Sequence, residues 1–249
     1  MKNVNEKQIK IGDVFESTNF GKFKILSYQR CNQVKVKFLN TGYETTTTTS
    51  AIFKGSVKDR QAPFVEGVGI VGDISPNSNF QTRKFYDMWK GMLKRCYNEH
   101  TLHKRPSYKG CSVSEKFLNF SSFYTWCLNQ IGHDQEGWHL DKDILVKGNK
   151  VYSEETCCFV PPEINILLAY NKAKESDLPT GVLYSKEKRK YRVQLVINGT
   201  RKHVGYFEDV GKAHQAYLKI KKGELLRIAE KWKSLIDENV YLALISYID

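Results

Sequence analysis

The chain has 249 residues, and its 39 Lys and Arg exceed its 27 Asp and Glu, which gives a formal charge of +12. A composition of 41% hydrophobic and 12% aromatic residues is enough to bury one core or several small ones, so a generally disordered chain is excluded. Most of the positive excess lies before residue 70 and after residue 178. This predicts a polyanionic partner, with a solvated lysine surface that only maintains solubility as the alternative.

Targeting signals and cysteine chemistry limit the function further. The sequence has no apolar stretch long enough for a membrane-spanning helix, and its first residues lack the apolar core of a signal peptide. The six cysteines form no CxxC pair, so we expect no structural zinc. We therefore expect a cytoplasmic protein with reduced thiols and no membrane partner, located in the host cytoplasm if the protein is viral.

Residues 1–60 are predicted to form a small β-barrel-like domain. Short strand-like stretches alternate with glycine turns, and Val34 to Phe38 alternates apolar and lysine side chains. The alternating lysines either follow phosphates or form a solvated strand face. The threonines at 45–49 form either an edge strand or a flexible hairpin arm, and β-branching favours the strand. Residues 61–80 are rich in Gly, Pro, Asn and Ser, which predicts a linker.

Residues 81–170 are predicted to form a helical module followed by two strands and a helix. Apolar residues at steps of three and four predict one helix from Phe80 to Tyr97 and another over about 117–130. From residue 138 the order is a strand, a turn at KGNK, a returning strand at VYS and a helix. Residues 171–179 are polar and predict a second linker.

Residues 180–249 are predicted to form three short strands and two helices, at about 209–222 and 223–237. One face of the sheet would pack on the first helix through Ala213, Ala216 and Tyr217. Alternation places Arg192 and Gln194 on the other face, and these side chains can pair with guanine and adenine edges. The cationic residues expected around that face are Lys186, Lys188, Arg189, Arg201, Lys202 and His203.

The sequence thus predicts a multidomain α+β protein. Its parts are an N-terminal small β-barrel, a central helical plus ββα-metal-like module, and a C-terminal three-stranded antiparallel sheet packed on a helix.

The C-terminal string TGVLYSKEKRKYRVQLVINGTRKHVGYFEDVGKAHQAYLK resembles the Apetala/ethylene-response-factor DNA-binding domain. It shares a Gly-Val first strand, a Gly-aromatic-Phe end to the third strand and an Ala-rich helix. The resemblance implies sequence-selective binding of double-stranded DNA through the sheet, with contacts from Lys186, Lys188, Arg192, Gln194 and Lys202. Thr180 stands where plant members usually have Arg, which leaves the base preference open.

Oxygen and nitrogen donors in the central module predict a cation site. A strand period of two places His139, Asp141 and Asp143 on one side, and Asn149 and Asn165 follow in the turn and the helix. Such donors suit Mg²⁺ or Mn²⁺. In the alternative interpretation, the two aspartates form ion pairs with nearby lysines (Lys142, Lys147 or Lys150), and the two asparagines cap a turn and a helix.

The stretch LDKDILVKGNKVYSEETCCFVPPEIN resembles a diverged His-Asn-His (ββα-metal) nuclease core of bacteriophage homing endonucleases. The resemblance implies a metal held by Asp141 and Asn165, Lys142 as the general base and Asn149 as the residue that orients it. Lys142 replaces the usual histidine, and a lysine is ordinarily protonated at neutral pH. His139 is the alternative base.

Three functions follow from these features. The first is a phage-type DNA-binding protein that cuts or nicks DNA as a metal-dependent homing-type endonuclease. The second is a catalytically inactive DNA-binding regulator with the same architecture. The third is a viral protein that binds and inhibits a host protein.

Overall fold

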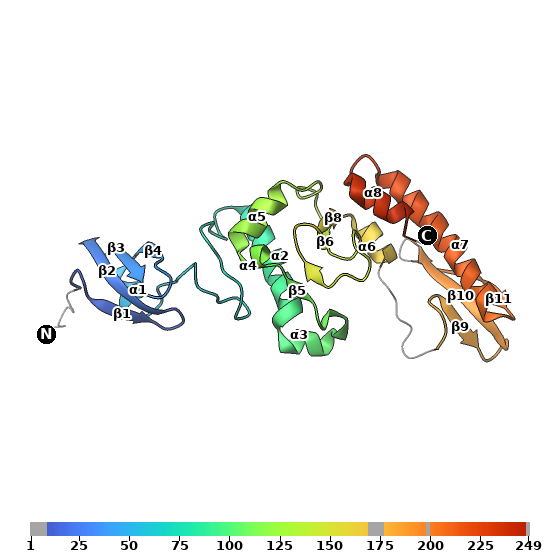
Figure 1. Cartoon of the computed structure of the whole chain (residues 1–249), viewed down its shortest axis with the longest axis horizontal. Helices are drawn as coiled ribbons and strands as arrows, with labels where there is room; N and C mark the ends of the chain where they lie inside the picture. Colours follow the sequence, from blue (N-terminus) through green and yellow to red (C-terminus); the bar gives the residue numbers. More distant parts are fainter. Residues whose placement is uncertain (1–8, 169–176, 198–199, 248–249) are drawn as a thin grey trace. The chain divides into compact units, whose positions relative to one another are not determined.

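The computed structural model describes residues 9–168, 177–197 and 200–247 (Figure 1). The fold is mixed α+β with several small sheets. The chain forms two compact units, one ending at Thr125 and one beginning at Trp126, so the boundary falls inside α5 (Phe120–Leu128). In the described part of the chain, no helix has both the length and the apolar character needed to cross a membrane.

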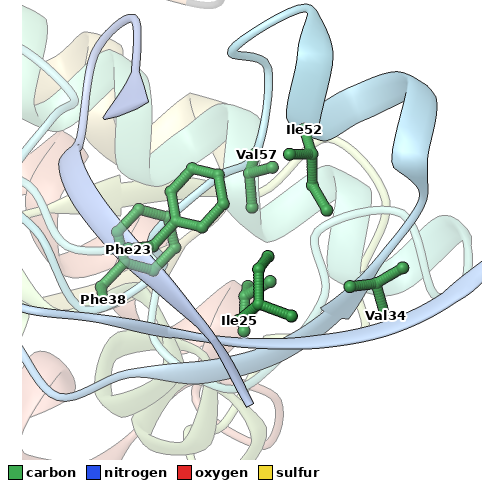
Figure 2. Close-up of a cluster of buried hydrophobic side chains, with 7 residues drawn as sticks. Phe23, Ile25, Val34, Phe38, Ile52 and Val57 are labelled. Atoms are coloured by element: carbon green, nitrogen blue, oxygen red, sulfur yellow. The ribbon is translucent and has the colours of Figure 1, made fainter. Parts of the chain in front are cut away.

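The N-terminal sheet is an antiparallel meander of β1 (Val14–Ser17), β2 (Gly21–Arg30), β3 (Gln33–Phe38) and β4 (Glu44–Thr47). Every second side chain of β3 is buried, as the alternation predicts, and in β2 Phe23 and Ile25 are buried; they share a core with Ile52 of α1 (Thr49–Phe53). Figure 2 shows this core, which consists of Phe23, Ile25, Val34, Val36, Phe38, Ile52 and Val57. Within the described residues β1 and β4 are the two edges, so the sheet is open where a closed barrel was expected. The threonine run forms β4 and then the N-cap of α1 at Thr48.

The rest of the first unit is helical, and its longest helix has the predicted bounds. The elements are α2 (Phe80–Tyr97), α3 (Glu99–Lys104), a 3-10 turn (Pro106–Tyr108), β5 (Ser112–Val113), α4 (Glu115–Leu118) and α5. A reciprocal cap between Asn79 and Thr82 starts α2, and its buried face carries Phe85, Trp89, Met92 and Leu93.

The expected second helix is interrupted at Asn119, whose backbone is extended. The neighbouring amide of Phe120 donates to the carbonyl of Ile70 at 2.8 Å, so the segment predicted as a linker supplies a backbone partner here. That segment also packs closely on α2, because a Cβ at Gly69 would lie 2.8 Å from the Trp89 ring. Residues 61–80 are therefore part of the folded unit.

In the second unit the central strands pair differently from the prediction. β6 (His139–Asp141) pairs antiparallel with β8 (Cys158–Val160), and β7 (Val151–Tyr152) is not its partner. The expected hairpin through KGNK is therefore wrong. All three residues of β8 are buried, so its apolar run forms the more buried strand of this two-stranded sheet, and α6 (Pro162–Leu168) follows it.

The C-terminal sheet has the predicted three antiparallel strands, β9 (Val182–Ser185), β10 (Lys190–Ile197) and β11 (Thr200–Phe207), with β10 in the centre. The two predicted helices are instead one continuous helix, α7 (Val210–Trp232), followed by α8 (Glu238–Ile245). Buried Leu225, Ile228 and Ala229 continue the apolar face beyond Gly223, so packing offsets the weak helix propensity of glycine. Most of the predicted linker, residues 171–176, lies outside the described residues.

Candidate DNA interface and candidate metal site

Helix α7 covers one face of the C-terminal sheet, and within the described residues the other face is left uncovered. Val193, Leu195 and Ile197 of β10 are buried against Ala213 and Tyr217 of α7. Arg192 and Gln194 alternate with them and are half-buried on the opposite face, where the sequence places them. Figure 1 shows α7 lying alongside the strands of this sheet.

The strand register identifies the neighbours of these two side chains. Arg192 lies opposite Leu183 of β9 and Tyr206 of β11, and Gln194 lies opposite His203. A bulge adds one residue to β11, so His203 and Tyr206 share this face although they are three residues apart. Their rings are in contact, with centroids 4.8 Å apart. Sequence reasoning missed Leu183 and Tyr206, because neither the register nor the bulge can be read from apolar alternation.

Arg192 carries an unsatisfied donor. Its Nε is buried and has no hydrogen-bond partner within the described residues. Leaving a buried donor unpaired costs about 1–3 kcal/mol. An acceptor brought by a ligand, together with a shift of the side chain, would remove this cost.

Most of the predicted cations surround the uncovered face. Lys186, Lys188 and Arg189 are exposed in the turn between β9 and β10, and Arg201 and His203 are exposed on β11. Lys202 is not brought together with them. It lies opposite Leu195, whose side chain is buried on the α7 side, so the register assigns Lys202 to the other face.

Asp141 ends β6 and closes the loop that follows. Its Oδ1 accepts hydrogen bonds from the backbone N–H groups of Asp143 at 2.7 Å and Ile144 at 2.9 Å. Burial raises the pKa of Asp141 and outweighs the opposing effect of these hydrogen bonds. Because the strand ends here, the expected alignment of Asp143 with His139 and Asp141 on one strand face is wrong.

Lys142 and Asn149 hold the same loop from inside. The buried Nζ of Lys142 donates to Asp143 Oδ1 and, at 2.9 Å, to the carbonyl oxygen of Asn149. Asn149 Nδ2 donates in return to the carbonyl oxygen of Lys142 at 2.7 Å. A general base needs a free lone pair, so an ammonium group held by two acceptors is poorly arranged for that role. The Lys142–Asp143 pair matches the alternative interpretation of these residues as ion pairs.

Helix α6 brings Asn165 to His139. The amide nitrogen of Asn165 lies 3.2 Å from His139 Nδ1, and the imidazole is exposed. His139 and Asp141 share one side of β6, because they are two residues apart on a strand. His139 is thus the better placed of the two candidate bases.

The donors fit a divalent cation only in part. Within the described residues no three His, Cys, Asp or Glu side chains are grouped so as to hold a metal ion. Asp141 supplies one carboxylate and Asn165 one amide, a set that suits Mg²⁺ or Mn²⁺ when waters and substrate phosphate complete the coordination. Burial raises the pKa of Cys157 to about 12 and that of Cys158 further, so both neighbouring thiols are protonated at neutral pH in the metal-free protein.

A cluster around Glu163 connects α6 to α7, and sequence reasoning missed it. The carboxylate of Glu163 accepts hydrogen bonds from Lys231 and, at 2.9 Å, from Trp232 Nε1. Lys221 Nζ donates to the carbonyl oxygen of Leu167 at the end of α6. The helix that carries Asn165 is therefore fixed to the helix that supports the C-terminal sheet.

Comparison with protein-family models, with curated proteins and with solved structures finds no match to this chain. Two features of the second unit indicate a function. One is the uncovered sheet face around Arg192 and Gln194, and the other is the group formed by His139, Asp141 and Asn165.

Proposed function

We propose that the C-terminal sheet binds double-stranded DNA, with the face opposite α7 directed into the major groove. The observation that carries this proposal is the position of Arg192 and Gln194, side by side on the central strand of a face that α7 leaves uncovered. Forked side chains of these two types can recognise guanine and adenine by paired hydrogen bonds. The resemblance to the Apetala-type domain supports the same orientation.

The surrounding charges fit the phosphate backbone. The turn before β10 and the start of β11 carry exposed cations at both ends of the uncovered face, with Lys188 and Lys190 partly neutralised by Glu187 and Glu208. Contacts to phosphate fix the position of a protein on the duplex, and contacts to base edges give sequence preference. We therefore expect the cations to position the protein on the duplex, and Arg192 and Gln194 to give the sequence preference.

Selection of duplexes from a random library, followed by mobility-shift competition, tests the proposal. Arg192→Ala and Gln194→Ala should each reduce discrimination between the selected duplex and a base-substituted one by about 1–3 kcal/mol. Lys219→Ala is the matched control, because Lys219 is exposed on α7 away from this face, and it should leave discrimination unchanged. If both sheet variants discriminate between the two duplexes as well as the parent does, this face of the sheet is not the surface that contacts the bases, here called the reading surface.

The salt dependence of duplex binding distinguishes the third function, binding of a host protein, from both DNA functions. A protein that contacts phosphates loses affinity steeply as salt rises, because binding releases counterions. Absence of duplex binding even at low salt would remove the DNA proposals and leave the host-protein function.

Nuclease activity is a second proposal, and the contact between His139 and Asn165 beside Asp141 favours it. In this proposal His139 takes the proton of a water whose oxygen bonds to phosphorus, while the bond from phosphorus to one sugar oxygen breaks and that oxygen is protonated from solvent. Asn149 holds the loop through its hydrogen bond to the carbonyl oxygen of Lys142. Asp141 and Asn165 would hold Mg²⁺ or Mn²⁺, and the bound ion would stabilise charge on the phosphate oxygens. A chain that binds DNA without nicking it under either metal would be the inactive regulator.

A further inference from the structure

The outer face of the N-terminal sheet carries a group of four lysines, Lys22, Lys24, Lys35 and Lys37. They alternate along β2 and β3 with the buried side chains of the core in Figure 2, and all four are exposed. The inner face of the sheet is occupied by α1 through Ile52. The four lysines therefore project from one uncovered sheet surface.

The register places two of these charges directly opposite each other. Lys24 of β2 pairs with Lys37 of β3. Like charges in directly opposed positions destabilise a sheet. Lysines often protect an exposed sheet edge from unwanted pairing, but β2 and β3 are the two central strands, so this explanation does not apply.

The acidic residues of the same surface lie on the edge strands. Glu44 of β4 pairs with Lys35 at 2.9 Å and with Lys37 at 3.3 Å, and hydrogen bonds from Lys35 and then Lys37 lower its pKa. Glu16 of β1 lies opposite Lys22 in the register. In the part of the chain that the structure describes, Lys22 and Lys24 form no ion pair. The centre of the face thus keeps ammonium groups that are open to an external anion.

We propose that this face binds the phosphate backbone of the same DNA duplex without regard to sequence. The proposal rests on DNA binding by the C-terminal sheet and adds a second contact surface in the first unit. Lysine is a flexible point charge, which suits phosphate oxygens at varied positions better than it suits base edges. A phosphate placed between Lys24 and Lys37 would also reduce their mutual repulsion, which within the described residues of the free protein is offset only by the pairing of Lys37 with Glu44.

The test is the salt dependence of duplex binding by the full chain with Lys24→Ala and Lys37→Ala combined. Removing two phosphate contacts should make the slope of log affinity against log salt shallower by about 1.8. The loss of affinity between 50 and 200 mM salt should then be about twelvefold smaller than in the parent. Discrimination between duplexes should not change, because this surface reads no bases. The thermal unfolding temperature should change little, since the variant removes the Lys24–Lys37 repulsion together with the Lys37–Glu44 ion pair, and Glu44 keeps its pair with Lys35.

The matched control combines Lys54→Ala with Lys58→Ala, which removes the same charge from two exposed positions that follow α1 and lie outside the strands. Its salt slope should equal that of the parent. Equal slopes for the parent and the Lys24/Lys37 variant would overturn the proposal, and so would an equal change in both double variants, which would indicate only a general charge effect. If either of these results occurs while discrimination between duplexes stays at the parental level, DNA binding by the C-terminal sheet still holds. If the parent binds no duplex at all, both DNA-binding proposals are wrong.

Discussion

Glu163 is the residue through which α6 holds α7, and its ionisation is predicted to affect stability. Burial raises its pKa, but hydrogen bonds from Lys231 and Trp232 and the charges of Lys231 and Arg227 outweigh burial and leave the pKa below its ordinary value of 4.5. A lowered pKa in the folded state means that the carboxylate stabilises the fold above the unfolded-state pKa. That stabilisation is lost as pH falls through the folded-state pKa.

Glu163→Gln should lower the free energy of unfolding by about 1–2 kcal/mol at pH 7, because it removes charge-assisted hydrogen bonds from a side chain that is 20% exposed. The difference from the parent should shrink as pH falls below 4.5, since the parent then protonates as well. Urea unfolding from pH 7 to pH 3 measures this. Glu187→Gln is the control, with a side chain 82% exposed and an expected change within about 0.5 kcal/mol. A difference independent of pH would show that Glu163 acts through packing.

At the residue scale the sequence predicts which face a side chain occupies when alternation is regular. Arg192 and Gln194 are placed correctly for this reason. Lys202 is misplaced because it lies between Arg201 and His203 on a strand whose successive side chains point to opposite faces, and the register pairs it with the buried Leu195. The burial of Lys142 was not predictable either, since it depends on a carbonyl seven residues later in the chain.

At the element scale, the contact of β9 with α7 depends on Gly181, immediately before the strand. Gly181 has φ +80°, and a Cβ there would overlap the ring of Tyr217. Its carbonyl oxygen also accepts the N–H of Gln194, so the backbone cannot move away without disturbing β10. The glycine thus fixes how the reading surface lies on its supporting helix.

Gly181→Ala should destabilise the second unit more than Gly148→Ala does, by about 1–3 kcal/mol. Gly148 has φ +79° and open space around its Cβ position, so its variant measures the cost of the left-handed backbone alone. Thermal unfolding of both variants gives the comparison. Equal effects would mean that the Tyr217 ring moves aside freely, and the strand position would then be less constrained than the structure indicates.

A helix is predictable from the sequence when its apolar residues keep a regular spacing over many turns. A short strand that is defined by a partner far away in the sequence is not. α2 has the predicted ends because Asn79 and Thr82 cap an apolar face with consistent spacing. The partner of β6 is misassigned because Val151–Tyr152 follows a glycine-containing turn that suggests a hairpin, whereas Cys158–Val160 lies in a stretch predicted as loop and helix. Only burial distinguishes them, and burial depends on the whole unit.

On the scale of the molecule, α7 connects the two candidate sites of the second unit. Its 23 residues correspond to about 35 Å of helix. Ala213 and Tyr217 support the sheet, and Lys231 and Trp232, near its other end, contact Glu163 of α6. Trp138, which precedes β6, packs edge to face on Trp232. The position of a duplex bound by the sheet would therefore be fixed relative to His139 and Asn165.

Nicking of supercoiled plasmid by the full chain with Mg²⁺ or Mn²⁺ tests whether the second candidate site is active. His139→Ala should reduce the nicking rate by about 10²- to 10⁴-fold, the usual contribution of a general base, with duplex affinity unchanged. Asp141→Asn should also abolish nicking, and this variant retains Oδ1 as the acceptor for the two loop amides, so loss of activity would not reflect loss of the loop. Glu155→Ala, at an exposed carboxylate outside the group, is the control and should nick at the parental rate. If His139→Ala nicks as fast as the parent, the proton is taken by another group, and the pairing of His139 with Asn165 serves only to join β6 to α6.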